Sequence, residues 1–440
     1  MHTRRSPDKW EFRRTRPVVF CAASAAISIW YKLAIGLTNC TNATYPPDVI
    51  TRTLGPQVHR LARHFPVVTV TGPRQSGKTT LCRTVFPGHR FVTLEAPDVR
   101  AFAASDPRGF LEPLSDGAII DEVQRVPDLL SYLQVEVDAH PRHGRFILTG
   151  SANLALMESV GQSLAGRTAL LQLLPCELGE VRQFPGAGRD LLSTVWTGGY
   201  PAIFDRDVPA GEWLGAYLAT YVERDARQLL NIGDLVAFQT FIRMCGGRVG
   251  QLLNLSSLGA DSGITHNTAR AWLSVLETSY LAFRLQPWHV SVSTRLVKSP
   301  KLYFHDTGLL CYLLGIRQEQ QLREHPLRGA IFENWVVSEV VKRYVHTGVR
   351  PEIYFLRDHK GFEVDLLVAG SERWTAVEIK SGKTVAQDYF TALRALPGRL
   401  SLPVGVSGLD RAVVYGGDEA SVQDDVRVIP WSGVAELGPR

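Results

Sequence analysis

The feature that most constrains this chain is a glycine-rich loop that begins at residue 72. The run from Gly72 to Thr79, Gly-Pro-Arg-Gln-Ser-Gly-Lys-Thr, fits the spacing GxxxxGK[ST] and follows an apolar strand expected over 67–71. Glycine is needed there because backbone N–H groups wrap closely around a phosphate, and the following helix adds its positive dipole end. The sequence therefore predicts a nucleotide phosphate cradle between a buried strand and a helix.

The positions of this loop have expected roles toward ATP and Mg²⁺, the two predicted cofactors. Lys78 is expected to reach the β- and γ-phosphates, and the Thr79 hydroxyl to ligate Mg²⁺. The residues expected to contact the nucleotide are Gly72, Pro73, Arg74, Gln75, Ser76, Gly77, Lys78, Thr79 and Thr80. Lys78 is also a candidate catalytic residue, because its charge can stabilise the phosphoryl group in transfer.

Two acidic residues, Asp121 and Glu122, directly follow an apolar strand expected over 118–120. This is the Walker B arrangement of P-loop enzymes. Asp121 is expected to hold Mg²⁺, directly or through water, and Glu122 to polarise the attacking water. The alternative interpretation is an ordinary acidic strand end.

A later strand, expected over 145–149, ends in polar residues that could sense the γ-phosphate. The candidates are Thr149, Ser151 and Asn153. The alternative is a turn with a helix cap at Ser151.

Phosphoryl transfer also favours an arginine at the developing negative charge. Arg167 is the first candidate for this catalytic role and Arg224 the second. The alternative for either residue is a surface salt bridge.

Short apolar strands alternate with helical stretches up to about residue 175, and this alternation predicts an α/β fold with a parallel sheet covered on both faces. The pattern then becomes helical, and a second α/β block begins at about Gly329. The expected division is an N-terminal extension over 1–46, an ATPase core over 47–175, a helical lid or connector over 176–240, a winged-helix-like section over 241–315 and a final α/β domain over 316–440.

Five motifs occur in an order that resembles a prokaryotic AAA-type P-loop ATPase family with a C-terminal domain of unknown function. They span residues 70–80, 120–124, 148–151 (Leu-Thr-Gly-Ser), 163–167 (Ser-Leu-Ala-Gly-Arg) and 298–308. The resemblance covers roughly residue 48 to the end, and the family normally begins near Ile50. It implies the architecture more than the cellular role.

The section over 241–306 carries a helix, a glycine turn and a second helix, which is the order of a helix-turn-helix. The second helix is expected over 268–280. Its expected core side holds Ala271, Trp272, Val275, Leu276 and Tyr280, and its expected exposed side holds His266, Asn267, Arg270 and Ser274. This section contains seven Lys/Arg and only three Asp/Glu, so it is locally basic, and DNA is a possible partner. The alternatives are a rigid connector or an oligomer lid.

Polar residues in the last domain form a second constellation. Glu378 and Lys380 alternate with apolar residues in a strand expected over 374–380, so both face one side. Asp365, in the preceding strand, is expected beside them, and Glu333 is expected to approach from a helix. Glu363 is expected on the opposite face, outside the site.

This constellation resembles the PD-(D/E)xK nuclease fold, especially its Holliday-junction-resolvase branch. The resemblance implies that Asp365, Glu378 and Glu333 ligate a metal ion and that Lys380 is the catalytic lysine. Val364 stands where the motif's name has proline. The alternative is an inactive nuclease scaffold that binds a partner, with Glu378 and Lys380 as an ion pair.

The net charge of +5 is confined to the N-terminal extension. Residues 1–45 hold seven Lys/Arg against two Asp/Glu, so the remainder is neutral overall. Global basicity therefore gives no argument for nucleic-acid binding. The extension imitates a signal peptide, but its apolar run is short for a membrane span. We expect a disordered segment or a start-site artefact, with no stable membrane association.

Six cysteines without a CxxC pair favour free thiols in a reducing, cytoplasmic compartment. Two functions from different classes remain open at this stage. The first is an ATP-driven enzyme that processes DNA, and the second is a nucleotide-controlled switch that binds a partner and cuts nothing. A homo-oligomer is possible for both.

Overall fold

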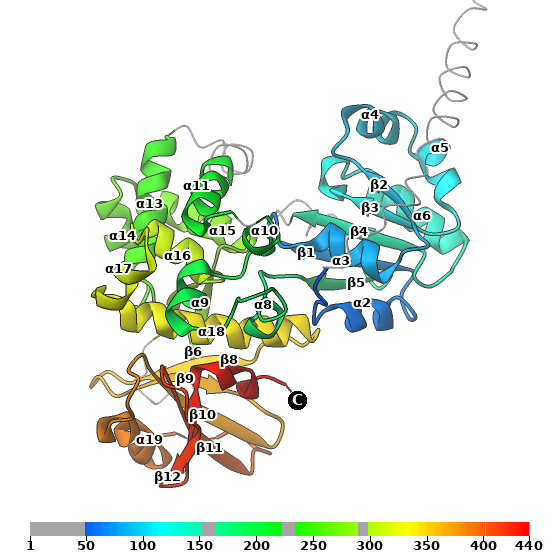
Figure 1. Cartoon of the computed structure of the whole chain (residues 1–440). Coiled ribbons are helices and arrows are strands. Elements are labelled where there is room, and N and C mark those ends of the chain that lie inside the picture. Colours follow the sequence, from blue (N-terminus) through cyan, green and yellow to red (C-terminus); the bar gives the residue numbers. More distant parts are fainter. Residues whose placement is uncertain are drawn as a thin grey trace, which may run out of the picture.

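A computed structural model describes residues 49–151, 163–206, 208–221, 234–288, 298–400 and 402–439. The fold is α/β, with a parallel sheet in the N-terminal module and a larger mixed sheet in the C-terminal module. Figure 1 shows a helical section beside the first module and above the second. The described helices include none long and apolar enough to cross a membrane.

The N-terminal sheet is parallel throughout, with the order β2-β3-β4-β1-β5. Its strands are β1 (Val67–Gly72), β2 (Arg90–Thr93), β3 (Ala118–Asp121), β4 (Phe146–Ser151) and β5 (Thr168–Gln172). The helices around it are α2 (Gly55–Leu61), α3 (Lys78–Val85), α4 (Pro97–Ser105), α5 (Pro107–Leu111) and α6 (Leu129–Ala139). Every residue of β1 is buried, because apolar clusters pack on both faces of the sheet.

The helical section follows β5 and shares one large apolar core with part of the C-terminal module. Its helices are α8 (Leu178–Val181), α9 (Leu191–Thr197), α10 (Pro201–Asp205), α11 (Ala210–Tyr221), α13 (Leu235–Gly247), α14 (Leu255–Asp261), α15 (His266–Thr278), α16 (Thr307–Leu313) and α17 (Glu319–Glu324). Helices α14 and α15 pack together around a glycine turn, and Thr265 caps α15 by accepting from the Thr268 N–H. Ala271 was expected in the core but is exposed, and Leu273 is buried instead.

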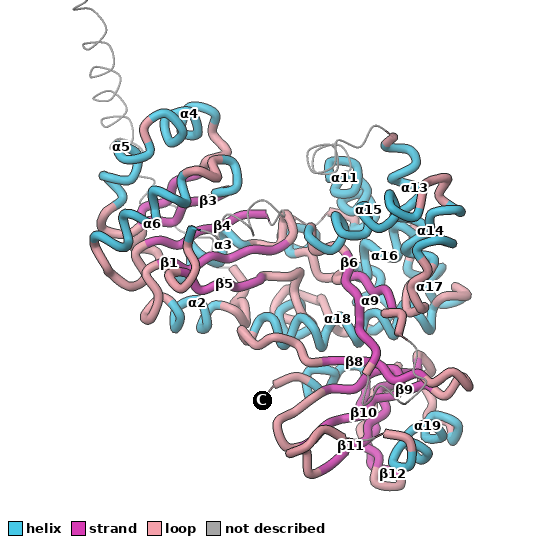
Figure 2. Tube along the Cα trace, turned by 180° about the vertical axis from the view of Figure 1, so that it is seen from behind, coloured by secondary structure: helices cyan, strands magenta, loops and turns pink. Residues whose placement is uncertain are grey.

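The C-terminal sheet has eight strands in the order β12-β13-β11-β10-β9-β8-β6-β7. They are β6 (Ala282–Pro287), β7 (Lys301–Phe304), β8 (Ile353–Arg357), β9 (Glu363–Val368), β10 (Arg373–Lys380), β11 (Gly408–Tyr415), β12 (Ser421–Gln423) and β13 (Val426–Pro430). Strand β6 pairs with β7 in antiparallel and with β8 in parallel orientation. Figure 2 shows β6 running from the helical section toward the C-terminal strands, so the antiparallel pair after α15 belongs to the sheet of the last module.

The long helix α18 (Arg328–His346) joins all three parts of the chain. It lies against the C-terminal sheet and extends toward the N-terminal module in Figure 1. Its polar side chains bind the backbone that leaves β5: the Leu174 N–H donates to His346 Nε2 at 3.1 Å, and the Leu178 N–H donates to Glu339 at 2.6 Å. Both N–H groups are buried and need hydrogen-bond acceptors, and α18 supplies these acceptors to the segment between β5 and α8.

Candidate nucleotide site and C-terminal charged cluster

The glycine-rich loop has the backbone that its sequence predicts. Gly72 has a φ of 150°, and a Cβ there would lie 2.1 Å from the carbonyl oxygen of Leu173. Gly77 has a φ of 90° and Gln75 a φ of 63°, both in the left-handed region. These positions turn the chain tightly between β1 and α3, which aims the N-terminus of α3 into the loop.

The ammonium group of Lys78 lies at the centre of this turn. Its Nζ donates to the carbonyl oxygens of Gly72 at 3.1 Å and Pro73 at 2.7 Å. Burial lowers the pKa of Lys78 to about 8, while Glu122 and Asp121 act in the opposite direction. Within the described residues its hydrogen-bond acceptors are neutral carbonyls, and a buried cation held in this way is well placed to bind phosphate oxygens.

Asp121 is the point where three elements of the module meet. Its Oδ1 accepts from the Thr79 hydroxyl at 2.8 Å and from the Thr149 hydroxyl, and its Oδ2 accepts from Thr93 at 3.4 Å. The predicted pair Thr79 and Asp121 is thus brought together. Thr149, expected at the γ-phosphate, contacts the carboxylate instead. A hydroxyl and a carboxylate at this spacing suit Mg²⁺, which prefers hard oxygen ligands.

Glu122 adopts the left-handed conformation with a φ of 57°, which turns its side chain away from the strand direction. Gln124 holds it there, because the Gln124 amide donates to Glu122 and, at 2.9 Å, to the Ser151 hydroxyl. Gln124 was not among the predicted site residues. The third polar candidate on this edge, Asn153, lies outside the described residues.

A cavity of about 1310 Å³ opens over these groups. Arg74, Gln75, Gly77, Lys78, Thr79, Thr80, Asp121 and Glu122 line one side of it. Pro201 from α10 and Trp213 and Tyr217 from α11 line the other side. The helical section therefore supplies an aromatic wall to the nucleotide cavity, which no local motif indicated.

The two candidate arginines are not brought to this cavity. The carbonyl of Arg167 accepts from the Val67 N–H at 3.2 Å, so Arg167 lies at the start of β1, whereas the phosphate loop follows its end. Its exposed guanidinium pairs with Asp138 at 2.6 and 2.8 Å. The structure thus removes Arg167 from the nucleotide site of its own chain. Arg224 lies outside the described residues.

In the C-terminal module, Asp365, Glu378 and Lys380 lie together as predicted. Lys380 Nζ lies 2.5 Å from Glu378 Oε1 and 3.8 Å from Asp365 Oδ2. The Ile379 N–H also donates to Asp365 at 2.8 Å. Burial and then Asp365 raise the pKa of Glu378 to about 7. Two buried acids share one ammonium group here, so the charge is only partly balanced.

Glu333 reaches the same cluster from α18 and is held by two residues of β7. Lys301 Nζ lies 3.0 Å from Glu333 Oε1, and the Tyr303 hydroxyl donates to the same oxygen at 2.5 Å. Burial and then Asp365 raise the pKa of Glu333 to about 7. Lys301 is only 2% exposed and was not among the predicted site residues.

The expectation that Glu363 lies outside this cluster is wrong. Glu363 lies 2.5 Å from Lys301 and so joins the pair that Lys301 makes with Glu333. The physical reason is the period of a strand: residues two apart, such as Glu363 and Asp365, point to the same face. The cluster therefore has four carboxylates, from Glu333, Glu363, Asp365 and Glu378, and three cations, from Lys301, Lys380 and Arg357, whose guanidinium lies 3.0 Å from Glu363.

Lysine side chains, rather than open space, separate the predicted metal ligands of this cluster. Over the described ranges, no group of three or more His, Cys, Asp or Glu side chains is arranged to hold a metal ion. Glu333, Asp365 and Glu378 are thus near one another, but the structure does not assemble them as a three-carboxylate metal site. Lys301 and Lys380 occupy the positions between their oxygens.

Comparison with known proteins places the chain in a family. The uncharacterized proteins Rv2008c of Mycobacterium tuberculosis (strain ATCC 25618 / H37Rv) and Mb2031c of Mycobacterium bovis (strain ATCC BAA-935 / AF2122/97) are each 34% identical to it over 390 residues. The matches cover 87% of this chain and 84% of each relative. The chain belongs to the family of these mycobacterial proteins.

Family models divide the sequence into three matched regions. An AAA domain matches residues 64–182, and two domains of unknown function, DUF8612 and DUF4143, match residues 188–320 and 328–434. The AAA match contains the whole loop, strand and carboxylate arrangement described above, so the N-terminal module is an AAA-type P-loop ATPase domain. The C-terminal match supplies no activity, and the nuclease likeness stays a prediction.

Solved structures are similar at low identity. The Walker-type ATPase paby2304 of Pyrococcus abyssi is 14% identical, with a TM-score of 0.42, and the match covers 62% of this chain and 99% of that chain. A variant of RuvB from Thermotoga maritima is 17% identical, with a TM-score of 0.28 and coverage of 52% and 87%.

The ATPase module also contains a buried arginine that the motifs did not indicate. Arg52 donates to the carbonyl of Ser76, within the phosphate loop, at 2.7 Å and to that of Leu174 at 2.8 Å. Its Nε lies 3.0 Å from Glu180, which in turn lies 3.5 Å from His346 of α18. Arg52 thus ties the phosphate loop to the chain that leads into the rest of the molecule.

Proposed function

We propose that this protein hydrolyses ATP at the P-loop and uses the cycle to drive a nucleic-acid-binding or nuclease-like C-terminal module. The observation that carries the first half is the position of Asp121. Its carboxylate accepts hydrogen bonds from the hydroxyl groups of Thr79 and Thr149. Asp121, Thr79, Lys78 and Glu122 all line the same cavity. This is the set of groups that phosphoryl transfer requires.

Each residue then has a defined task toward ATP. Lys78 binds the β- and γ-phosphate oxygens, and backbone N–H groups of the loop bind the same phosphates. Thr79 and Asp121 hold Mg²⁺, which neutralises charge on the phosphates when bound. Glu122 orients the attacking water and takes up its proton, and Gln124 fixes Glu122 in place for this step.

Arg167 fits a role between two copies of the chain. Its exposed side chain lies at the opposite end of β1 from the loop, so it can reach a phosphate only in a neighbouring subunit. This proposal requires a homo-oligomer. ATP turnover per subunit should rise with protein concentration in the wild type, and Arg167→Ala should remove that rise. Turnover that is independent of concentration and of Arg167 would contradict it.

The nucleic-acid half rests on the exposed face of α15 and on the charged cluster. His266, Asn267 and Arg270 are exposed on α15, which follows α14 and a glycine turn and which we take as the second helix of a helix-turn-helix. A gel-shift series with single-stranded, duplex and branched DNA tests this face. Arg270→Glu should weaken binding of the preferred form, and unchanged affinity would argue against α15 as the contact.

Cleavage would need the lysines of the cluster to release their carboxylates. If a metal ion bound there, Asp365 and Glu378 would hold it, and Lys380, released from these carboxylates, would be free to stabilise the scissile phosphate. Mg²⁺-dependent nicking of branched DNA that disappears in Lys380→Ala would support this activity.

A second candidate function is a nucleotide-controlled switch whose C-terminal module binds a partner without cutting. The pairing of Lys301 and Lys380 with carboxylates of the cluster favours this candidate, because a metal ion would have to displace a lysine to bind there. ATP turnover measured with and without each DNA form separates the two. Strong stimulation by one form favours the DNA-processing enzyme, and a wild type that neither responds to nor cuts any form favours the switch.

A further inference from the structure

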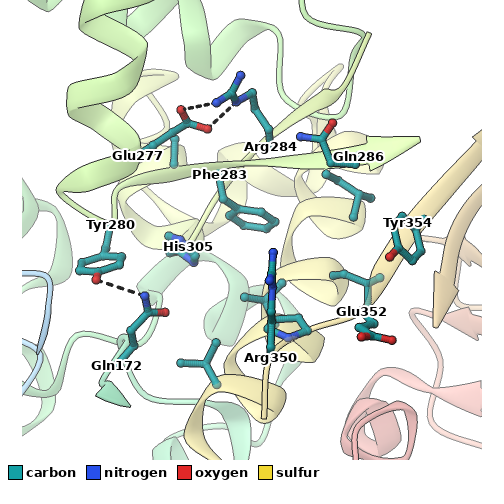
Figure 3. A pocket seen from close by; sticks show the side chains of 16 residues that line it. Gln172, Glu277, Tyr280, Phe283, Arg284, Gln286, His305, Arg350, Glu352 and Tyr354 are labelled. Carbon is teal, nitrogen blue, oxygen red and sulfur yellow. Dashed lines mark hydrogen bonds and ion pairs between the residues drawn. The ribbon is translucent and has the colours of Figure 1, made fainter. Parts of the chain in front are cut away.

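A second cavity lies where the three modules meet, away from both sites described above. Its volume is about 600 Å³, within the range of small-molecule pockets. Its walls come from the end of β5, from α15 and β6, from α18 and from the loop before β8. Figure 3 shows its labelled side chains converging from these separate elements.

One wall of this pocket is a run of aromatic rings. The Phe283 ring lies 4.6 Å from the His305 ring at 31°, and His305 contacts Tyr280 edge-on at 6.5 Å. Burial lowers the pKa of His305 to about 3, so this ring is neutral and the wall is uncharged. Phe283 is only half-buried, which leaves part of its ring open to the pocket.

The polar groups of the pocket are arranged around this wall. Glu277 and Arg284 bind each other through two contacts of 2.6 and 2.9 Å, which leaves neither free for a ligand charge. Arg350 is exposed and, within the described part of the chain, forms no ion pair; Figure 3 shows it extending from the opposite side toward Phe283. Gln286 places a side-chain amide at the rim.

We propose that this pocket binds a nucleobase, stacked between Phe283 and the guanidinium of Arg350. Planar bases stack on aromatic rings and on arginine planes, and side-chain amides pair with base edges. The base can belong to a free nucleoside or nucleotide, or to a single-stranded nucleic acid.

Tyr280 connects this pocket to the phosphate loop. Its hydroxyl lies 3.1 Å from the Thr71 hydroxyl and accepts from the Gln172 amide at 3.2 Å. Thr71 directly precedes Gly72, so a ligand against Tyr280 lies one side chain from the strand that carries the loop. Tyr280 also has a left-handed backbone with a φ of 56°, and its two hydrogen bonds hold its side chain against β1 and β5. A base bound here should therefore change ATP turnover, a readout that rests on the proposed hydrolysis.

The test measures binding and turnover separately. Titration calorimetry without ATP uses the four nucleosides, which lack the phosphates that the P-loop binds, and short single-stranded oligonucleotides. At least one of these probes should bind, and Arg350→Met should weaken its binding about tenfold. Arg323→Met, on an exposed surface of α17, is the matched control and should bind as the wild type does.

The two probe classes distinguish the source of the base. Nucleoside binding indicates a free small molecule, and binding of oligonucleotides alone indicates a base of a nucleic-acid strand. Phe283→Leu should weaken the same probe, with thermal unfolding as a check on folding. The proposal would be overturned if neither probe class bound, or if the affinity of the probe were unchanged in both Arg350→Met and Phe283→Leu. Either result would hold whatever the ATPase activity proves to be.

Tyr280→Phe tests the connection, since it removes the hydroxyl and keeps the ring. This variant should bind the probe normally, but its ATP turnover should no longer respond to the probe. A response equal to that of the wild type would show that Tyr280 does not carry the effect.

Discussion

The nucleotide site and the C-terminal cluster both bring carboxylates and lysine side chains together beside a sheet, but they satisfy these charges in different ways. At the nucleotide site, Asp121 accepts from hydroxyl groups and Lys78 donates to carbonyl groups. In the cluster, Lys380 and Lys301 bind carboxylates directly. Neutral partners leave the full charge of a side chain available to a ligand, whereas an opposite charge cancels it.

This difference indicates that the nucleotide site is preorganised for its ligands and that the C-terminal cluster is not. The nucleotide site can receive Mg²⁺ and phosphate without breaking an ion pair. The cluster must first separate lysine from carboxylate, and that costs free energy in a buried setting. The cluster therefore resembles a closed or inactive state of a metal site, and the two regions should respond differently to the same kind of substitution.

The largest effect should come from removing a buried lysine of the cluster. Lys301→Met leaves Glu333 and Glu363 without their shared cation, and breaking a buried ion pair costs about 3–5 kcal/mol. Chemical denaturation followed by circular dichroism measures the loss. Lys298→Met, at an exposed position nearby, is the control. An equal, small change in both variants would show that the cluster does not depend on its ion pairs.

At the nucleotide site, the same kind of substitution should affect activity instead of stability. Lys78→Ala removes the cation that binds the phosphates and should reduce ATP turnover about 10²- to 10³-fold. Its unfolding free energy should not fall, because burial already disfavours the charged form of Lys78 and, among the described residues, no carboxylate lies in hydrogen-bonding contact with it. Lys383→Ala, an exposed lysine, is the control for turnover.

The smallest effects concern pH, where the two regions should differ in sign. The pKa of Glu378 is raised to about 7, so its contribution to stability is present at low pH and is lost as pH rises through about 7. The pKa of Lys78 is lowered to about 8, so stability should rise with pH above that value. Each group contributes a slope of at most about 1.4 kcal/mol per pH unit.

Denaturation curves at several pH values, without nucleotide or metal, measure these slopes. Glu378→Gln should lose less stability than the wild type between about pH 5 and pH 8, because the amide does not titrate. A parallel decline in both proteins would show that Glu378 is already ionised at low pH in the folded state.

The sequence predicts most of the ATPase module, because its determinants are local. The loop from Gly72 to Thr79 and the Asp121-Glu122 pair each sit at the end of an apolar strand, and parallel strands bring those ends to one edge. Arg52 and Gln124 carried no such signal. A buried arginine is recognised only when its distant partners, such as Glu180, are known.

The C-terminal cluster was predicted less completely, for two physical reasons. Lys301 reaches it from β7, far away in the sequence, so its pairing depends on a strand order that local patterns do not give. The side of Glu363 could have been predicted, because strand alternation places it with Asp365. The sequence named Arg167 as a candidate for phosphoryl transfer but did not show that it lies at the opposite end of β1 from the phosphate loop, because its motif carries no information about sheet position.

Glu122→Gln tests the central claim, ATP hydrolysis at the Asp121-Glu122 edge, most directly. The measurement is phosphate release from saturating ATP with Mg²⁺, beside equilibrium binding of ATP to both proteins. The variant should bind ATP as tightly as the wild type and release phosphate at least about 10²-fold more slowly, because it loses the carboxylate that orients the attacking water and takes up its proton. The account would be contradicted if the wild type released no phosphate, or if Glu122→Gln released phosphate as fast as an active wild type.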